Sequence, residues 1–117
     1  MADIVIIQSN TTFQAEKLVY ALINAGFRAE KAEIHYNKLK GLQGTKESNQ
    51  YPLTLTGILD RMPTIIKVNG VTAGYGGSGP NAMVGILKYA GFIFDKDDIL
   101  TERYCNSDGY IGLIYSK

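Results

Sequence analysis

Apolar residues follow two different spacings along the first quarter of the chain. Residues 3–8 form a β-branched and almost continuously apolar run, which predicts a strand buried on both faces. Residues 11–25 carry apolar side chains every three or four positions, after the capping residues Ser9 and Asn10 and before Gly26. Because glycine is a frequent residue just past a helix end, this stretch predicts a helix that stops at Gly26.

The next three segments have weaker patterns. Residues 27–36 alternate, but neither phase is cleanly apolar, so they predict a strand at an exposed edge of a sheet. Residues 37–50 are polar and include several lysines. They predict a solvated loop, with a flap that closes over a ligand as the alternative. Residues 51–59 place apolar side chains along one side of a short helix, although Gly57 weakens this interpretation.

Two hairpins are predicted in the second half of the chain. Residues 64–68 and 71–73 flank Asn69-Gly70, a pair typical of a type I′ turn. Residues 99–105 and 110–115 flank a second turn at 106–109.

Between the two hairpins the pattern becomes helical again. Residues 81–90 predict a helix that Gly91 ends, and an extended segment and an acidic turn follow at 92–94 and 95–98. The sequence Ala-Gly-Phe ends both predicted helices, at 25–27 and at 90–92. An ancient duplication is one explanation, and the common form of an amphipathic helix with a glycine stop is the other.

These patterns together predict an α+β fold with a mostly antiparallel sheet of about six strands and two main helices. At 117 residues the chain is long enough for one domain and one core, so residues 1–117 are interpreted as a single domain. A hydrophobic content of 45% and a charged content of 20% are those of an ordinary water-soluble protein.

Charge and cysteine content exclude several classes of protein. A net charge of +1 disfavours a protein that binds duplex nucleic acid, which needs a strongly basic face. A single cysteine, Cys105, allows no disulfide within the chain and favours a cytoplasmic location. One cysteine and one histidine, His35, cannot build a zinc site, and no apolar run is long enough to span a membrane. No metal and no cofactor are expected.

The run from Gly74 to Asn81 is the strongest candidate for chemistry. Four glycines stand among six residues, and Pro80 follows them at the start of a predicted helix. A bare backbone that leads into a helix N-terminus can direct several N–H groups at one anion, most often a phosphate. We expect the N–H groups of Asn81, Ala82 and Met83 to be free for this purpose. The candidate ligand-binding residues of this loop, with an aromatic ring that can stack on a base, are Tyr75, Gly76, Gly77, Ser78, Gly79 and Asn81.

The glycine run does not match either common phosphate-binding motif. It lacks the Gly-Lys-Ser/Thr ending of a Walker A loop, and its glycines do not have the Gly-x-Gly-x-x-Gly spacing of a dinucleotide-binding turn. The alternative is a tight, irregular connection between a hairpin and a helix. If a phosphate is bound, Arg28 and Arg103 are the candidates for its countercharge, ahead of Arg61. Each of these arginines has an ordinary surface charge as its alternative.

Evidence for catalysis is weak. His35 is the one imidazole and lies in a poorly patterned segment, and no serine stands in a nucleophile elbow. The aspartates at 95, 97 and 98 lack the spacing of a calcium loop and predict a solvated turn. The sequence therefore favours a protein that holds a nucleotide over an enzyme that cleaves one.

From Gly74 to Asn81, followed by a short helix that ends at Gly91-Phe92, the chain resembles the phage Thoeris anti-defence sponge family, first type. The resemblance implies sequestration, without degradation, of a cyclic ADP-ribose signal made by bacterial TIR-domain immune enzymes. It also implies binding of cyclic oligonucleotides by some members, and assembly into dimers or larger homo-oligomers. By the same resemblance Tyr75 would face the base, Arg28 and Arg103 would contact phosphates, and Asn81 would lie nearby.

The expected function is therefore non-enzymatic sequestration of a cyclic ADP-ribose-type nucleotide in the cytoplasm of an infected bacterial cell, which would inhibit TIR-based anti-phage defence. Two like subunits would complete the pocket. Two alternatives stay open. One is a nucleotide-processing enzyme with its base at His35 or in the acidic turn. The other is a protein–protein inhibitor that uses some of the eight tyrosines as interface anchors.

Overall fold

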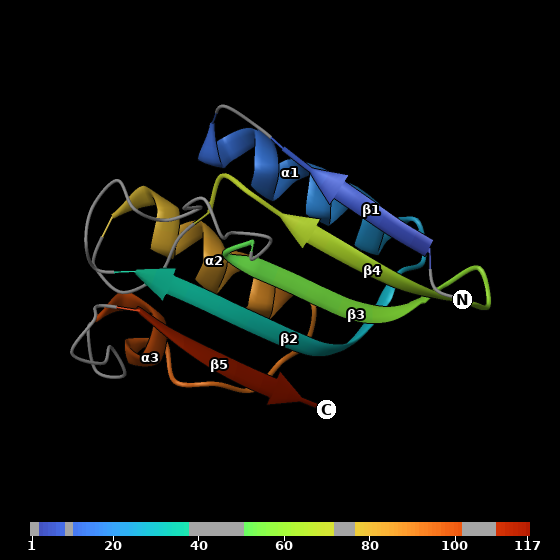
Figure 1. Cartoon of the computed structure of the whole chain (residues 1–117). Coiled ribbons are helices and arrows are strands. Elements are labelled where there is room, and N and C mark those ends of the chain that lie inside the picture. Colours follow the sequence, from blue (N-terminus) through green and yellow to red (C-terminus); the bar gives the residue numbers. More distant parts are fainter. Residues whose placement is uncertain (1–2, 9–10, 38–50, 72–76, 102–109) are drawn as a thin grey trace.

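The computed structural model describes residues 3–8, 11–37, 51–71, 77–101 and 110–117, and it has the α+β architecture that the sequence predicts (Figure 1). The described part contains five strands and three helices, compared with the six strands and two main helices expected. In chain order these elements are β1 (Asp3–Ile7), α1 (Thr12–Asn24), β2 (Arg28–Asn37), β3 (Leu53–Leu59), β4 (Met62–Val68), α2 (Ser78–Tyr89), α3 (Asp97–Leu100) and β5 (Tyr110–Ser116).

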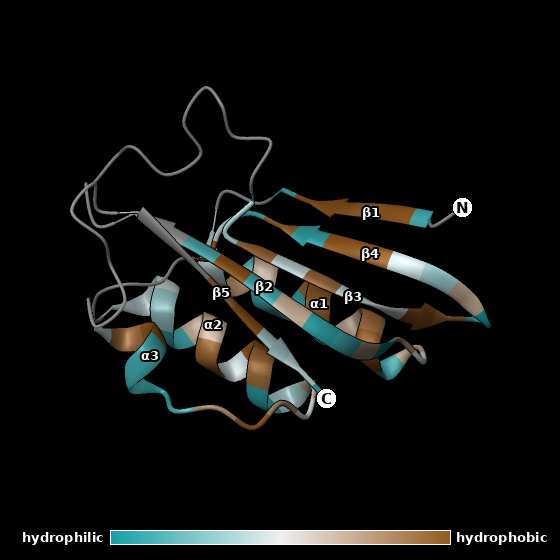
Figure 2. Cartoon of the chain, turned by 60° about the horizontal axis from the view of Figure 1, so that its bottom comes forward, coloured by the Kyte–Doolittle hydropathy of each residue, from teal (hydrophilic) through white to brown (hydrophobic). Residues whose placement is uncertain are grey.

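The strands form one mixed sheet in the order β1-β4-β3-β2-β5. β1 pairs with β4 in parallel, and the other three neighbouring pairs are antiparallel. All three helices lie on one face of this sheet, as Figure 2 shows. The opposite face carries no helix among the described residues, and we call it the open face.

β1 is an edge strand, and the prediction that it is buried on both faces was wrong. Ile7 is buried beneath the helices, but Ile4 and Ile6 are 57% and 54% exposed. Side chains alternate across a strand, so Ile4 and Ile6 point to the open face. A continuous apolar run predicts burial on both faces, but among the described residues helices cover only one face of the sheet.

β2 is an interior strand between β3 and β5, which corrects the expectation of an exposed edge. Its register against β3 shifts between Ala29 and Lys31. This β-bulge explains the unclear alternation, because Ala29 and Ala32 are both buried although they are three positions apart. Opposite the bulge stands Gly57, where a Cβ atom would lie 2.0 Å from the carbonyl oxygen of Arg28. The close approach of the two backbones requires glycine at this position.

Residues 53–59 form strand β3, not the short helix considered from the sequence. Leu53, Leu55 and Gly57 are buried and the residues between them are half-buried, so the apolar period is two. Asp60 and Arg61 join β3 to β4 with φ angles of 53° and 65°. Two successive residues with positive φ make a type I′ turn, here without any glycine.

The first predicted hairpin is wrong in its pairing, and the second is wrong where the structure describes its first strand. Asn69-Gly70 follows β4, whose neighbours are β1 and β3, so this pair does not close a two-residue hairpin. β5 pairs with β2, and residues 97–100, which include the start of the predicted strand at 99–105, form α3. Residues 72–73 and 102–109, which belonged to the predicted hairpins, lie outside the residues that the structure describes.

Both main helices are present, and their ends have the same geometry. Gly26 and Gly91 have φ angles of 115° and 91°. The next residue in each case, Phe27 or Phe92, donates its N–H to the carbonyl five positions back, Leu22 or Leu87, at 3.0 Å. This is the Schellman arrangement that the two glycines predicted. A shared local motif accounts for the repeated Ala-Gly-Phe, and the duplication stays a prediction.

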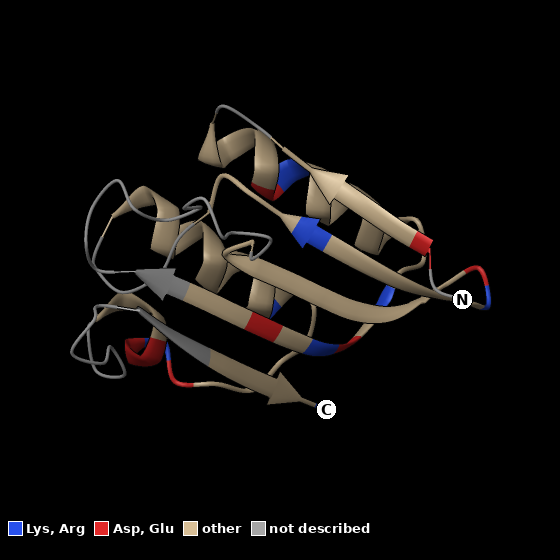
Figure 3. Ribbon diagram, viewed as in Figure 1, with Lys and Arg blue, Asp and Glu red and all other residues tan. Residues whose placement is uncertain are grey.

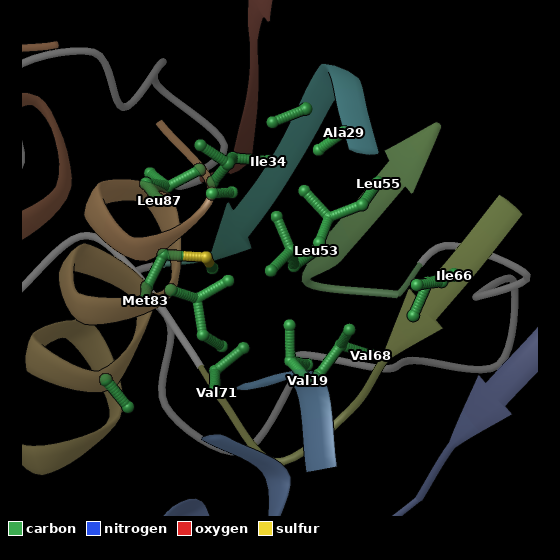
Figure 4. Close-up of a cluster of buried hydrophobic side chains, with 14 of the residues drawn as sticks. Val19, Ala29, Ile34, Leu53, Leu55, Ile66, Val68, Val71, Met83 and Leu87 are labelled. Atoms are coloured by element: carbon green, nitrogen blue, oxygen red, sulfur yellow. The ribbon is translucent and has the colours of Figure 1, made fainter. Parts of the chain in front are cut away.

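The hydrophobic core lies between α1 and α2 and the covered face of the sheet (Figure 4). Met83 and Leu87 extend from α2 towards Ile34 and Leu53 on the central strands. These four side chains have no exposed surface. Their burial removes the apolar faces of both helices from water and fixes α2 over the centre of the sheet.

Candidate functional site

The N-terminal end of α2 contains the described part of the glycine run. The helix begins at Ser78, three residues before the predicted start, and Gly77 is its N-cap. Among the described residues no side chain caps this end by a hydrogen bond. At α1, by contrast, the Thr11 side chain accepts a hydrogen bond of 3.1 Å from the N–H of Gln14. The two helices therefore differ in how their first turns are satisfied.

The amides that we expected to face an anion are used within the helix. The main-chain N–H of Asn81 donates to the carbonyl oxygen of Gly77 at 3.0 Å. Ala82 and Met83 lie deeper in the helix, where each N–H pairs with the carbonyl four residues back. The N–H groups that have no acceptor within the helix are those of Ser78 and Gly79. Pro80 has no N–H group. The amides that are available for an anion therefore begin at Ser78, three residues before the expected start at Asn81.

The residues of the first turn of α2 differ in their exposure to solvent. Ser78 and Asn81 are exposed, Gly77 is half-buried, and Gly79 and Pro80 are buried. Gly77 has a φ of 163°, an extended conformation open to any residue. Its identity therefore does not come from backbone strain. The Asn81 side chain donates from Nδ2 to the carbonyl oxygen of Gly77 at 2.7 Å, which fixes the loop against the helix.

Helices α1 and α2 run parallel, so their N-termini lie at the same end of the molecule. Tyr20 and Tyr89 stack with ring centroids 4.4 Å apart. Along the same contact the Tyr89 hydroxyl donates to Oδ1 of Asn24, and Gly85 approaches Glu16 closely. Neither helix has an acidic residue in its first turn. The positive ends of two helix dipoles are thus side by side and unneutralised by first-turn carboxylates.

The strands that precede these two helices end at the same place. β1 and β4 are parallel neighbours, and the N–H of Asn69 donates to the carbonyl oxygen of Ile7 at 2.8 Å. Each strand is followed in the chain by one of the parallel helices. This end of the molecule is the one towards which both helix N-termini point (Figure 1).

Arg28 lies at the opposite end of the helices, so one chain does not bring it together with the glycine turn. It lines a cavity of about 660 Å³ beside the C-terminal ends of α1 and α2, together with Ile23, Gly26, Phe27, Ala29, Glu30, Ala90 and Lys117. α2 has 12 residues, which corresponds to a separation of about 18 Å along its axis.

Sequence reasoning missed the role of Lys117 at this cavity. Its ammonium group donates to the carbonyl oxygen of Ala90, the C-cap of α2, and lies 5.0 Å from the centre of the Phe92 ring. A lysine at a helix C-terminus satisfies a free carbonyl and interacts favourably with the dipole. No signal in the sequence places residue 117 next to residue 90, because the contact depends on the pairing of β5 with β2.

Three candidate residues cannot be placed. Tyr75, Gly76 and Arg103 lie outside the residues that the structure describes. Arg61 is in the exposed turn at the start of β4, whereas the glycine run follows the other end of this strand.

The residues considered for catalysis lie on the open face of the sheet and in the acidic turn. Ile34 is buried beneath the helices, and the neighbouring His35 therefore points to the open face of the sheet. In the acidic turn, Oδ1 of Asp95 accepts the N–H of Asp97 at 3.0 Å, and Oδ2 of Asp98 accepts the Tyr115 hydroxyl at 2.8 Å. Within the described ranges no three His, Cys, Asp or Glu side chains lie close enough together to hold a metal ion.

A second polar contact that sequence reasoning missed lies within α1, on the side that faces α2. The Tyr20 hydroxyl donates to Oε2 of Glu16, one helical turn earlier. Burial raises the pKa of Tyr20 well above 10.0, and the hydrogen bond and negative charge of Glu16 raise it further, with a smaller contribution from Tyr89. The i, i+4 spacing of Glu16 and Tyr20 was the available signal.

Comparison with known proteins adds no relative. No family model, curated protein or solved structure matches the chain. None of the described helices is both long and apolar enough to cross a membrane.

Proposed function

We propose that this protein binds a phosphate-bearing adenine nucleotide at the N-terminal turn of α2 and holds it without chemical change. The ligand class is a cyclic ADP-ribose-type signal, and its sequestration would inhibit TIR-based anti-phage defence. The supporting observation is the first turn of α2, where Ser78 and Gly79 have amides without acceptors in the helix and no side chain that the structure describes forms a cap.

The electrostatics of this end of the molecule suit an anion. Two parallel helices present their positive ends together, and no carboxylate stands in either first turn. The exposed hydroxyl of Ser78 adds a hydrogen-bond donor next to the amides. A phosphate at this position would accept from main chain and hydroxyl together.

Holding the ligand intact fits the placement of the one histidine. His35 is on the open face, whereas α2 covers the other face, so the sheet separates this imidazole from the proposed site. An acid or base would therefore have to come from elsewhere. Tyr75 and Arg103 complete the proposed site as stacking ring and countercharge. Arg28, about 18 Å away along α2, would serve this ligand only from another subunit.

Calorimetric titration with cyclic ADP-ribose isomers tests the proposal. Ser78→Asp places a carboxylate in the first turn of α2, where it favours the helix but repels a phosphate. We expect it to weaken binding about tenfold or more, while Ser78→Asn, which has no charge, has a smaller effect. Thr12→Asp makes the same change at α1 and is the matched control, with an effect smaller than that of Ser78→Asp.

Binding that is equal in all these variants and in Tyr75→Ala would disprove the site. The enzyme alternative is tested separately by incubating the protein with the nucleotide, denaturing it with heat and analysing what is released. Sequestration returns the intact nucleotide in stoichiometric amount, whereas an enzyme returns a product.

A further inference from the structure

The outer edge of β1 is an unusual surface for a protein in water. β1 is one of the two edge strands, and among the described residues no strand pairs with its outer side. After Asp3 it consists only of valine and isoleucine, and it contains no proline, lysine or bulge. Edge strands are normally protected by such features, because unpaired N–H and C=O groups attract another strand. Figure 3 shows the single charge at the beginning of β1.

The free hydrogen-bonding groups belong to the two exposed isoleucines. In a parallel pair each residue directs its N–H and C=O to the same side, and successive residues alternate. The carbonyl of Ile7 accepts from Asn69 of the β4 side. Ile7 and Val5 therefore bond towards β4, whereas Ile4 and Ile6 direct both main-chain groups outwards. The exposed side chains of Ile4 and Ile6 stand over the open face at the same edge.

The flank of α1 beside this edge is uncharged as well. Glu16 and Tyr20 face α2, since both approach Gly85. Leu18 lies about 200° around the helix from each of them, on the flank that faces away from α2 and towards the β1 side. It is 47% exposed. The residues within about 60° of Leu18 on this flank carry no charge; they are Thr11, Gln14, Ala15, Ala21, Leu22 and Ala25.

We infer that a second copy of this chain pairs with β1 across a two-fold axis, so that the two sheets continue into one. With Val5 on the axis, Ile4 of each copy is opposite Ile6 of the other. These are the residues whose main-chain groups point outwards, so the antiparallel register forms hydrogen bonds and brings the exposed isoleucines into contact. In the same arrangement the two α1 helices lie side by side and antiparallel, with Leu18, the central residue of 12–24, close to its own copy.

The absence of charge near the axis favours a copy over another partner. A two-fold interface places each group near the axis against itself, so a charge there would meet an equal charge. β1 and the Leu18 flank of α1 carry no charge except Asp3, at the end of β1. Lys67 is one strand further from the axis, opposite Ile6 on β4, and its ammonium group lies 5.8 Å from the centre of the Tyr51 ring. The other edge is less suitable: in β5, Ile114 is the one strongly exposed large apolar residue that the structure describes, and Ser116 and Lys117 follow it.

Sedimentation velocity of the ligand-free protein at about 1 to 100 µM tests this inference, independently of the nucleotide site. We expect a dimer that Ile6→Pro converts to a monomer, because proline removes an outward N–H but no bond to β4. Ile6→Lys should do the same by charge repulsion. Ile114→Lys is the matched control, since Ile114 is 62% exposed on the open face of the other edge strand, and it should leave the dimer intact.

A cysteine at the axis gives a second measurement that does not depend on a destabilising substitution. Across a non-hydrogen-bonded pair the Cα atoms are about 4.5 Å apart, which is within disulfide range. Val5→Cys in a Cys105→Ser background should therefore form a covalent dimer on mild oxidation, and Ile114→Cys in the same background should not.

Three results would overturn the inference. They are a monomer over the whole concentration range, a dimer that survives Ile6→Pro or Ile6→Lys, and a dimer that Ile114→Lys dissociates. If both Ile6 variants fail to fold, the absence of a Val5→Cys cross-link overturns it as well. A monomeric protein that pairs β1 with a different polypeptide would also count against a second copy.

Discussion

Asn81 donates two hydrogen bonds to one acceptor, the carbonyl oxygen of Gly77. The main-chain N–H makes the first at 3.0 Å and side-chain Nδ2 makes the second at 2.7 Å. The residue expected to contact a ligand therefore holds the loop that leads into α2. The amides of Ser78 and Gly79 keep their direction because this loop is fixed at Gly77.

Loss of the Asn81 side chain should affect the proposed site more than the fold. Asn81→Ala removes one exposed hydrogen bond, so we expect the free energy of unfolding to fall by about 0.5–1.5 kcal/mol. We expect nucleotide affinity to fall by a larger factor, because the amide-bearing turn becomes less ordered. Chemical denaturation and calorimetry measure the two effects, and equal affinity for variant and wild type would contradict this role.

Substitution of Gly57 should destabilise the sheet. A Cβ atom at this position would lie 2.0 Å from the Arg28 carbonyl oxygen, inside the bulge of β2. We expect Gly57→Ala to lower the free energy of unfolding by about 2–4 kcal/mol, because main-chain atoms must move. Thr56→Ala, at the half-buried neighbouring position, is the control and should cost less. A Gly57→Ala protein as stable as the control would contradict the prediction, because it would mean that the main chain at the bulge moves at little cost.

The Tyr20 hydroxyl should make stability depend on pH in the alkaline range. Its folded-state pKa is raised above the ordinary 10.0, first by burial and then by Glu16. The folded protein therefore keeps this proton at a pH at which the unfolded chain loses it. The resulting stabilisation is fully present below pH 10 and declines as the pH rises towards the folded-state pKa.

Denaturation curves of wild type and Tyr20→Phe over this range measure the effect. We expect the stability difference between them to shrink above pH 10 as the wild type loses its advantage. Glu16→Gln keeps an acceptor but removes the charge, so it should reduce the pH dependence in part. A constant difference between wild type and Tyr20→Phe would contradict the assignment.

Lys117 should stabilise the C-terminal end of α2. Its ammonium group donates to the Ala90 carbonyl and lies over the Phe92 ring. Lys117→Met keeps much of the chain length but removes the charge and the donor, and we expect a loss of about 1 kcal/mol that decreases at high salt. Lys88→Met removes a charge from the last turn of the same helix and serves as the control. Equal losses of unfolding free energy in both variants would mean that the contact between Lys117 and Ala90 does not contribute to stability.

Local chemistry made part of the fold predictable. The helix at 11–25 was expected from its apolar spacing and is present as 12–24. Gly26 and Gly91 marked both helix ends correctly, because the Schellman turn needs a left-handed residue, which glycine adopts readily. Where a residue type strongly prefers one backbone conformation, as glycine does at these helix ends, the sequence alone was sufficient to predict the local structure.

The errors occurred where a distant partner decided the outcome. Asn69-Gly70 is a strong hairpin signal, but the hairpin formed at Asp60-Arg61, which adopts the same turn without glycine. The unclear alternation of β2 comes from a bulge that only its pairing with β3 defines. At the candidate site, the sequence placed the glycine run before a helix correctly. It could not tell that the helix begins at Ser78 and thereby uses the amide of Asn81.

The sequence by itself determined the α+β class, the two main helices and their glycine ends, because these depend on residues within a few positions of one another. Tertiary structure alone decided the strand order, the exposure of Ile4 and Ile6, and the separation of Arg28 from Ser78. Each of these depends on which face of the sheet the helices cover and on their parallel direction. Those relationships join residues far apart in the chain, and no local pattern of side chains encodes them.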